Sequence, residues 1–272
     1  MPRKAIGSIM ERGIFLNKNI EFDDPIDYDC AYLGDEFCEQ YLPSAASVDR
    51  AVNFCRRYSK KLTLVTPFLT NQGMTRLIKL IDFIDVNNIN AEIVINDWGL
   101  LKLLNKRASS FQRVLGRILV SRYLSKFHYN EAMRHFSSNK RRRFYCLFPE
   151  QFLDLLKAEK IFRLEFNSLN QLATTHLQIK ERGFKAHIYH PFMYITTSRY
   201  CNVAGGHDRS RYYSPTCTCS EECRESFAVK YNRYFKRKIF TKGNAYFIKQ
   251  TQDPGKLCFS IDRVVGNNFI ER

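Results

Sequence analysis

The feature that most constrains the fold is a regular alternation of short apolar runs with amphipathic stretches, which begins near Asp29. This alternation is typical of βα units around a parallel sheet. The runs recur roughly every 30 residues, about the length of one βαβ unit. That spacing favours an α/β fold with a (β/α) TIM-like barrel, complete or irregular, over an open sheet. The predicted strands are 28–33, 62–68, 92–95, 113–120, 161–166 and 186–189.

Amphipathic helices are expected between these strands, because apolar residues recur there at intervals of three or four. Ser44 precedes the first such stretch and is the expected N-cap, whereas Gly183 closes the last one as the expected C-terminal cap. The predicted helices are 44–58, 71–86, 150–160 and 170–182.

Two segments interrupt the alternation. Segment 121–146 is basic and rich in Tyr, His, Arg and Ser, and we expect it to be a lid or partner surface at the working face of the barrel. A loop rich in Cys, Gly, Ser and Arg follows Tyr200, and beyond it Lys242-Gly243-Asn244 predicts the turn of a β-hairpin. The expected organisation is a barrel-like domain over 1–223 that carries the cysteines, with a β-rich extension over 224–272 packed on it.

The charge balance suggests a polyanionic partner without naming it. The chain has 43 Lys+Arg against 27 Asp+Glu, a formal net charge of +16, and 14% aromatic residues. Basic and aromatic side chains together suit RNA binding, but the same excess charge also serves solubility alone. A hydrophobic fraction of 44% is enough for a large buried core, so a wholly disordered chain is excluded.

No stretch approaches the roughly 18 consecutive apolar residues that a membrane-spanning helix needs. The first residues are basic, but no long apolar segment or small-residue cleavage site follows them. We therefore expect a cytoplasmic protein without a membrane span.

The nine cysteines indicate metal chemistry, because thiols in the cytoplasm stay reduced. Cys217, Cys219 and Cys223 follow Cys201 in a loop whose other residues are small, polar or charged, unlike a hydrophobic core. Thiolates in this pattern bind a tetrahedral zinc ion or an iron–sulfur cluster. The spacing leaves both open, and it also leaves open a loop of unliganded thiols.

A further ligand is expected from the early part of the chain. Cys38 follows the first predicted strand at the end that faces the ligand site in a parallel barrel, whereas Cys30 lies inside that strand. Cys55 and Cys258 occupy apolar positions in a helix and in an alternating strand, so both are expected to be small buried hydrophobic residues.

Several short fragments, taken in order and with their spacing, resemble the collagenase-like peptidase U-32 family over roughly 29–223. Within that family they look most like the branch that takes part in oxygen-independent ubiquinone biosynthesis. The fragments are Tyr32-Leu33-Gly34-Asp35-Glu36-Phe37-Cys38, Ile95-Asn96-Asp97-Trp98-Gly99, Gly116-Arg117, Ser198-Arg199-Tyr200-Cys201 and Cys219-x-x-x-Cys223.

The resemblance implies a 4Fe-4S cluster held by Cys38, Cys201, Cys219 and Cys223, with Cys217 as an alternative ligand. Other branches carry His-Gly-x-x-Cys where this chain reads His190-Pro191-Phe192-Met193-Tyr194, so the first cysteine of that pattern is missing here.

The implied function is that of an iron–sulfur component of an oxygen-independent hydroxylation system, acting with a related subunit as a heterodimer. An RNA-modifying or RNA-binding protein of the same family is the alternative, and a zinc-stapled structural or adaptor protein is a further one.

Four polar residues are candidates for substrate binding. Asn96 and Asp97 end a buried strand, where they either face substrate or cap the next helix. Arg117 is predicted inside a strand and needs a carboxylate from the protein or from an acidic substrate. His190 follows a strand and is either an acid–base group or a hydrogen-bonded structural residue. Glu165 is predicted to face the barrel interior.

No catalytic residue can be assigned from the sequence. The chain contains no Gly-x-Ser-x-Gly, no His-Glu-x-x-His and no glycine-rich phosphate loop. We therefore expect neither protease activity nor a nucleotide cofactor.

Overall fold

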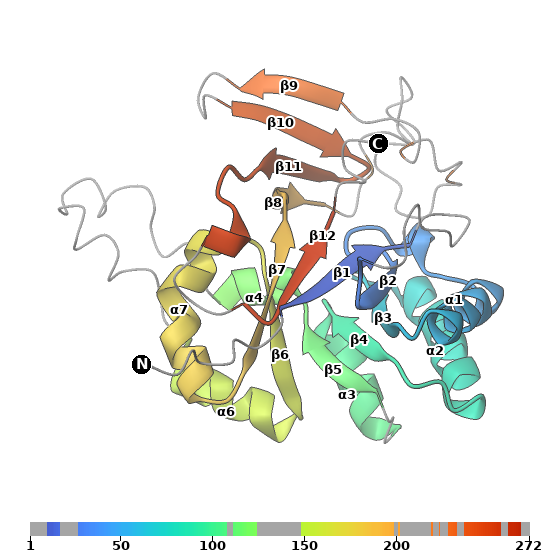
Figure 1. The fold of residues 1–272 in the computed structure, drawn as a ribbon. Helices are drawn as coiled ribbons and strands as arrows, with labels where there is room; N and C mark the ends of the chain where they lie inside the picture. The colour runs from blue at the N-terminus through green and yellow to red at the C-terminus, as the bar shows by residue number, and fades with distance from the viewer. Residues whose placement is uncertain are drawn as a thin grey trace.

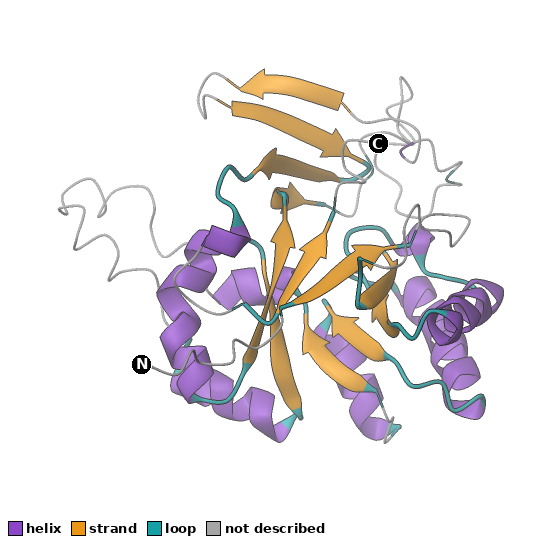
Figure 2. Cartoon of the chain, viewed as in Figure 1, coloured by secondary structure: helices purple, strands orange, loops and turns teal. Residues whose placement is uncertain are grey.

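Eight parallel strands close into a barrel in the order β1-β12-β7-β6-β5-β4-β3-β2, and helices cover its outside (Figures 1 and 2). The computed structural model describes residues 10–16, 27–107, 111–123, 148–198, 201, 219, 223, 228–232, 237–256 and 261–267. The predicted α/β TIM-like barrel is therefore confirmed. The barrel strands are β1 (Glu11–Phe15), β2 (Cys30–Gly34), β3 (Lys61–Val65), β4 (Glu92–Ile95), β5 (Gln112–Leu115), β6 (Ile161–Phe166), β7 (Lys185–His190) and β12 (Arg263–Gly266).

Strands β2 to β7 are the six that the apolar runs predict, but two of them end early: the predicted strand 62–68 ends at Val65, and the other needs a larger correction. The predicted strand 113–120 ends at Leu115, and Arg117 begins helix α4 instead of lying in the strand. Gly116 marks the break, because a Cβ atom there would stand 2.1 Å from Oδ1 of Asn96. Only glycine allows the chain to turn so close to that side chain.

Strands β1 and β12 close the barrel and were not predicted. They pair with each other in parallel, and they pair with β2 and β7 on their outer sides. Both strands are short and begin with a charged residue, Glu11 in β1 and Arg263 in β12, which hides the apolar pattern of a buried strand.

The helices follow the predicted ranges closely. Ser44 caps the first helix by accepting a hydrogen bond from the backbone N–H of Ser47, as expected. Gly183 follows the last one with a φ of +78°, the left-handed conformation that ends a helix. The helices are α1 (Ala45–Arg57), α2 (Asn71–Val86), α3 (Trp98–Lys106), α4 (Arg117–Tyr123), α6 (Glu150–Ala158) and α7 (Leu169–Glu181), with 3-10 turns η1 (Glu39–Tyr41) and η4 (Pro254–Lys256).

An antiparallel sheet in the order β8-β11-β10-β9 stands over the end of the barrel toward which β7 and β12 point (Figure 1). The hairpin predicted around Lys242-Gly243-Asn244 is the pair β10 and β11. Phe192, Phe240 and Phe247 form the buried centre of this sheet, and Phe37 of the barrel packs against them. The strands are β8 (Phe192–Thr197), β9 (Ala228–Asn232), β10 (Arg237–Lys242) and β11 (Ala245–Lys249).

Both structural units take strands from both sides of residue 223. Strand β8 lies before it and joins the antiparallel sheet, whereas β12 lies after it and joins the barrel. The division into 1–223 and 224–272 stays a prediction. Most of the basic segment 121–146 lies outside the described residues, as do Cys146 and Cys258.

Candidate functional site

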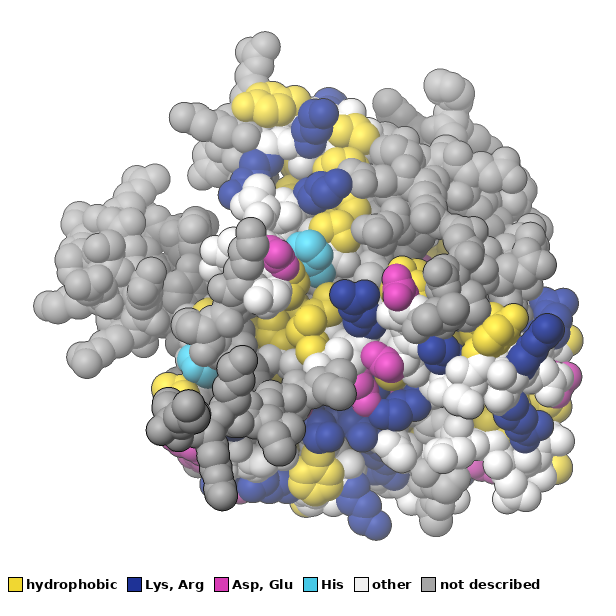
Figure 3. All heavy atoms as spheres, in the orientation of Figure 1, with side chains coloured by type: hydrophobic (Ala, Val, Ile, Leu, Met, Phe, Trp, Pro, Cys, Tyr) yellow, Lys and Arg dark blue, Asp and Glu magenta, His cyan; other side chains and the backbone are white. Residues whose placement is uncertain are grey.

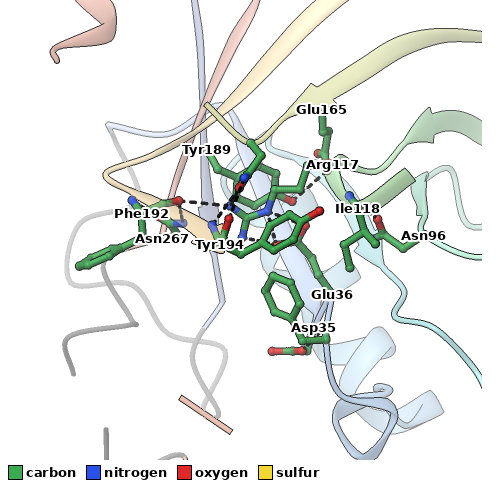
Figure 4. Close-up of polar contacts among 12 residues, drawn as sticks. Asp35, Glu36, Asn96, Arg117, Ile118, Glu165, Tyr189, Phe192, Tyr194 and Asn267 are labelled. Atoms are coloured by element: carbon green, nitrogen blue, oxygen red, sulfur yellow. Dashed lines mark hydrogen bonds and ion pairs between the residues drawn. The ribbon is translucent and has the colours of Figure 1, made fainter. Parts of the chain in front are cut away.

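The carboxyl-terminal end of the barrel is organised around one buried arginine (Figure 4). Arg117, at the start of α4, is fully buried and donates from Nε and Nη2 to the carboxylate of Glu36, at 2.6–3.0 Å. Glu36 follows β2 and is almost fully buried too. The carboxylate that Arg117 requires is therefore supplied by the protein itself.

The same guanidinium ties together segments that are far apart in sequence. Its Nη1 donates to the backbone oxygen of Phe192 at 3.2 Å, and its Cζ lies 3.8 Å from the ring centre of Tyr189. Burial disfavours the charged guanidinium, but the attraction of Glu36 holds the pKa of Arg117 above its usual value. Arg117 therefore remains charged and joins the loop after β2 to strands β7 and β8.

A second buried carboxyl group lies inside the barrel. Glu165 of β6 accepts hydrogen bonds from the hydroxyl groups of Tyr32 at 3.2 Å and Tyr189 at 2.9 Å. Burial, with the nearby charge of Glu36, raises the pKa of Glu165 to about 8. The expected inward orientation of Glu165 is confirmed by these contacts, and the carboxyl group is largely protonated at neutral pH.

Asn96 and Asp97 both make structural contacts at the strand ends. Asp97 caps α3 by accepting from the backbone N–H of Gly99 at 2.7 Å. The amide of Asn96 donates to the backbone oxygen of Thr66 and accepts from the backbone N–H of Ile118. Capping and bridging thus account for these two side chains in this structure, and their proposed contact with substrate stays a prediction.

His190 is the last residue of β7. Its Nε2 lies 3.2 Å from the backbone oxygen of Gln252, and burial lowers its pKa. A neutral imidazole at a backbone carbonyl fits the structural alternative, with Nε2 carrying the proton. Its acid–base role stays a prediction.

Cys38 lies in the loop that continues from Glu36. Oδ1 of the partly buried Asp35 accepts from the backbone N–H groups of Phe37 and Cys38, at 2.6 and 2.8 Å. Burial raises the pKa of Cys38, and the charges of Asp35, Cys223 and Cys219 raise it further. Asp35 therefore anchors the backbone of Cys38, and its thiol lies within electrostatic range of two cysteines from the late part of the chain.

Cys223 is the buried member of the late group. Its Sγ lies 3.0 Å from the hydroxyl oxygen of Tyr41, in the turn just after Cys38. Burial raises its pKa, the contact with Tyr41 opposes that effect, and Cys201 and Cys219 raise it again. Cys219 and Cys223 thus lie within electrostatic range of Cys38, and Cys201 and Cys219 lie within range of Cys223.

None of the six described cysteines forms a disulfide bond. No group of three or more described His, Cys, Asp or Glu side chains is arranged to hold a metal ion. Cys217, the alternative ligand, lies outside the described residues. Cys30 and Cys55 are buried in the core, and burial raises their pKa values to about 12 and about 11.

Three residues of this end of the barrel were missed by sequence reasoning: Glu36, Tyr41 and Asn244. Glu36 lies two positions before Cys38 in the fragment 32–38, but nothing in the sequence pairs it with Arg117. Asn244 has a signal, because it belongs to the predicted hairpin turn, yet a turn residue alone indicates only backbone geometry.

Basic side chains lie beside exposed apolar ones over β9 and β10, at the top of the space-filling view (Figure 3). Val229 and Tyr231 of β9 are exposed, Tyr231 to 60%. Lys230, Arg237 and Lys238 are exposed on the same two strands. The described residues of the four-stranded sheet include no Asp or Glu.

Comparisons with known proteins leave the family open. No family model matches the chain, and no curated protein matches it. A solved structure that does match is that of the U32 peptidase Mk0906, with a TM-score of 0.49 and 10% sequence identity over 98% of this chain and 95% of that chain. Neither family membership nor activity follows from a match at this level. Among the described helices, none has the length and apolar character to cross a membrane.

Proposed function

We propose that the chain is an iron–sulfur protein whose 4Fe-4S cluster binds to Cys38, Cys201, Cys219 and Cys223. The observation that carries this proposal is that the late cysteine-rich segment lies against the Cys38 loop: Sγ of Cys223 is 3.0 Å from the hydroxyl oxygen of Tyr41, in the turn that follows Cys38. Cysteine thiolates are the usual ligands of such clusters. The thiols would have to draw closer together than they lie here, and a loop segment allows that movement more easily than a strand does.

The surroundings of the thiols fit an anionic centre. The hydroxyl group of Tyr41 is placed to donate to Sγ of Cys223, and hydrogen bonds to cluster sulfurs tune the reduction potential. Lys242 lies within electrostatic range of Cys223 and offsets part of the thiolate charge. When bound, the cluster supplies one-electron transfer.

The resemblance of the cysteine-bearing fragments to the U-32 family supports a more specific role. It points to a component of an oxygen-independent hydroxylation system that works with a related subunit, as in the ubiquinone branch of that family. Cys38 is the residue that links this chain to that branch, because the cysteine expected after His190 in the other branches is absent.

The test is anaerobic purification followed by measurement of iron and acid-labile sulfide per chain. We expect about four of each in the unmodified protein, and loss of both in Cys38→Ala and in Cys223→Ala. Cys55→Ala is the matched control, because Cys55 is a buried cysteine of α1 and not a proposed ligand. This variant should retain its iron and sulfide.

Other results would contradict the proposal in different ways. Zinc without sulfide would favour the structural or adaptor alternative. Retention of iron in Cys38→Ala, with loss in a Cys217→Ala variant, would show that the late loop binds the centre without the barrel. A chain that binds no metal would leave the thiols as an unliganded group.

RNA binding is a second candidate function, because the β9–β10 register puts exposed Tyr231 and Val229 on one sheet face with Lys238, while Lys230 and Arg237 are exposed on the other face. Aromatic rings stack on bases while basic side chains contact phosphate. Affinity for single-stranded RNA should fall steeply with added salt, and Tyr231→Ala should weaken it about tenfold. Tyr58→Ala, an exposed tyrosine on α1, is the control.

A further inference from the structure

The β10–β11 turn joins the two parts of the chain that carry the cysteines. Asn244 is almost fully buried, and its Nδ2 donates to two backbone oxygens, that of Phe37 at 2.6 Å and that of Ser198 at 2.5 Å. Phe37 immediately precedes Cys38, and Ser198 lies three residues before Cys201. One side-chain amide therefore holds both approaches to the thiols.

The backbone of Asn244 strengthens the same connection. Its oxygen accepts from the backbone N–H of Ser198 at 3.1 Å and from the hydroxyl of Thr197 at 3.3 Å. The end of β8 is thus fixed to the turn by three hydrogen bonds. The direction in which the chain leaves β8 toward Cys201 depends on this turn.

The neighbouring glycine places the turn against a third cysteine. Gly243 has a φ of +58°, and a Cβ atom built on it would stand 3.6 Å from Sγ of Cys223. The left-handed conformation suits glycine, and the separation is that of ordinary van der Waals contact. The turn therefore contacts the residue before Cys38 and the residue three positions before Cys201, and it lies beside Cys223.

We propose that Asn244 is a positioning residue for the thiol site: its amide clamps the Cys38 loop to the strand that leads to Cys201, while the turn packs against Cys223. The clamp acts on the thiols whatever they bind. Its effect on a cluster rests on the proposed function.

The chemistry of the clamp requires an amide. Both partners of Nδ2 are carbonyl oxygens, which accept and cannot donate, so the nitrogen must face them. Aspartate has the same shape but no N–H group, and its carboxylate would face two carbonyl oxygens in a buried place. Asn244→Asp therefore removes both hydrogen bonds and adds repulsion, whereas Asn244→Ala only removes them.

The matched control is Asn267, which follows β12 and ties it to the start of β8. It is fully buried, its Nδ2 donates to the backbone oxygen of Phe192 at 2.9 Å, and its Oδ1 accepts from the N–H of the same residue at 3.0 Å. Asn267→Asp and Asn267→Ala thus disturb a similar buried amide at the start of β8, and neither of its two hydrogen bonds reaches Phe37 or Ser198.

The experiment measures thiol proximity in the full-length, metal-free chain. Dibromobimane joins two thiols that approach closely, and peptide mass spectrometry then quantifies the Cys38–Cys201 and Cys38–Cys223 products. Loss of two hydrogen bonds should reduce these yields about tenfold in Asn244→Asp and Asn244→Ala. The Asn267 variants should stay within about twofold of the unmodified chain.

The outcomes separate the clamp from the cluster. Unchanged yields in Asn244→Ala, or equal losses in Asn267→Ala, would overturn the proposal, and Asn244→Ala serves if the aspartate variant does not fold. If the Asn244 variants give reduced cross-linking yields but the unmodified chain binds no iron, the positioning role of Asn244 is supported and the proposed cluster is rejected. If iron binds, the reduction potential should shift in Asn244→Ala but not in Asn267→Ala, and equal shifts would count against a positioning role.

Discussion

The two ends of the barrel use the same chemistry, a buried arginine paired with carboxylates, but they arrange it differently. At the amino-terminal end of the strands, Arg263 donates to Glu11 and Glu92, at 2.5–3.1 Å. At the carboxyl-terminal end, Arg117 donates to Glu36. The Arg263 group joins residues of three strands, whereas the Arg117–Glu36 pair joins the start of a helix to a loop.

The amino-terminal network contains additional partners. Lys61 also pairs with Glu11, Arg163 lies 3.5 Å from Glu92, and the hydroxyl of Thr63 donates to Glu92 at 2.9 Å. Among the described residues, Arg117 is the one cation in ion-pair contact with Glu36. One end of the barrel is thus held redundantly, and the other end depends on a single arginine that is connected to the Cys38 loop.

A column of polar contacts joins the two networks through the barrel. Nη1 of Arg263 donates to the hydroxyl of Tyr32 at 3.1 Å, Tyr32 and Tyr189 donate to Glu165, and the ring of Tyr189 lies under the guanidinium of Arg117. The interior is therefore not purely apolar. Several ion pairs thus share the work of closing the barrel at the amino-terminal end of the strands. At the end that carries the cysteines, one arginine makes the corresponding ion pair alone among the described residues.

The largest effect is expected from Arg117→Met. It leaves the carboxylate of Glu36 buried without its cation, which should lower the free energy of unfolding by about 3–5 kcal/mol. Urea denaturation measures this, and the reactivity of Cys38 toward iodoacetamide should rise at the same time. Arg117→Lys is the control, because it restores the charge without the planar fork and should lose less stability. A loss below 1 kcal/mol in Arg117→Met would remove the contrast between the ends.

A smaller effect is expected from Arg263→Met at the redundant end. Lys61 and Arg163 still neutralise Glu11 and Glu92, and Glu11 is 30% exposed to water. The loss should be about 2–3 kcal/mol, below that of Arg117→Met, with unchanged reactivity of Cys38. If Arg263→Met proved the more destabilising of the two, redundancy would not describe the amino-terminal end.

Glu165 allows the column between the ends to be tested by pH. Its folded-state pKa is raised to about 8 from a reference value of 4.5, so the protonated form favours the folded chain. That contribution is complete below pH 4.5 and is lost progressively as the pH rises to about 8. Arg117, Arg263, Glu36, Tyr32 and Tyr189 are the groups that face it or act on it electrostatically.

The measurement for this prediction is the pH dependence of urea unfolding in the unmodified chain and in Glu165→Gln. Between pH 5 and 7 the unmodified chain should lose stability relative to the variant by about 1 kcal/mol per pH unit, because one proton is involved. Parallel curves would mean that Glu165 ionises normally in the folded state.

The smallest effect is expected from Lys61→Met. Lys61 pairs with Glu11 on the surface and is 57% exposed, and such pairs contribute less than about 1 kcal/mol. Lys61→Met alone should lower the free energy of unfolding by less than about 1 kcal/mol. In an Arg263→Met background the loss should grow, and the double-mutant cycle measures the redundancy directly.

Sequence reasoning predicted the barrel because β2 to β7 are apolar strands separated by amphipathic helices. It missed β1 and β12 because Glu11 and Arg263 are charged and find their partners only once the barrel is closed. It placed Arg117 in a strand because Ile118, Leu119 and Val120 continue the apolar run after it. The turn at Gly116 depends on the side chain of Asn96, which is a contact between separate strands.

The candidate site shows the same limit. Cys38 and the late cysteines were predicted because thiols among small polar residues do not suit a core. The roles of Glu36, Tyr41 and Asn244 depend on contacts across 81, 182 and 207 residues of sequence. Local patterns report helices, strands and turns, and they carry no information on which distant backbone oxygen a buried amide will reach.

The central claim is that Cys38 of the barrel and the late cysteines bind one centre. The most direct measurement is alkylation of the anaerobically purified, iron-loaded chain with iodoacetamide, read residue by residue by mass spectrometry. We predict that Cys38, Cys201, Cys219 and Cys223 are protected together and become reactive together when iron is removed. Alkylation of Cys38 in the loaded chain, while the late cysteines remain protected, would contradict the account.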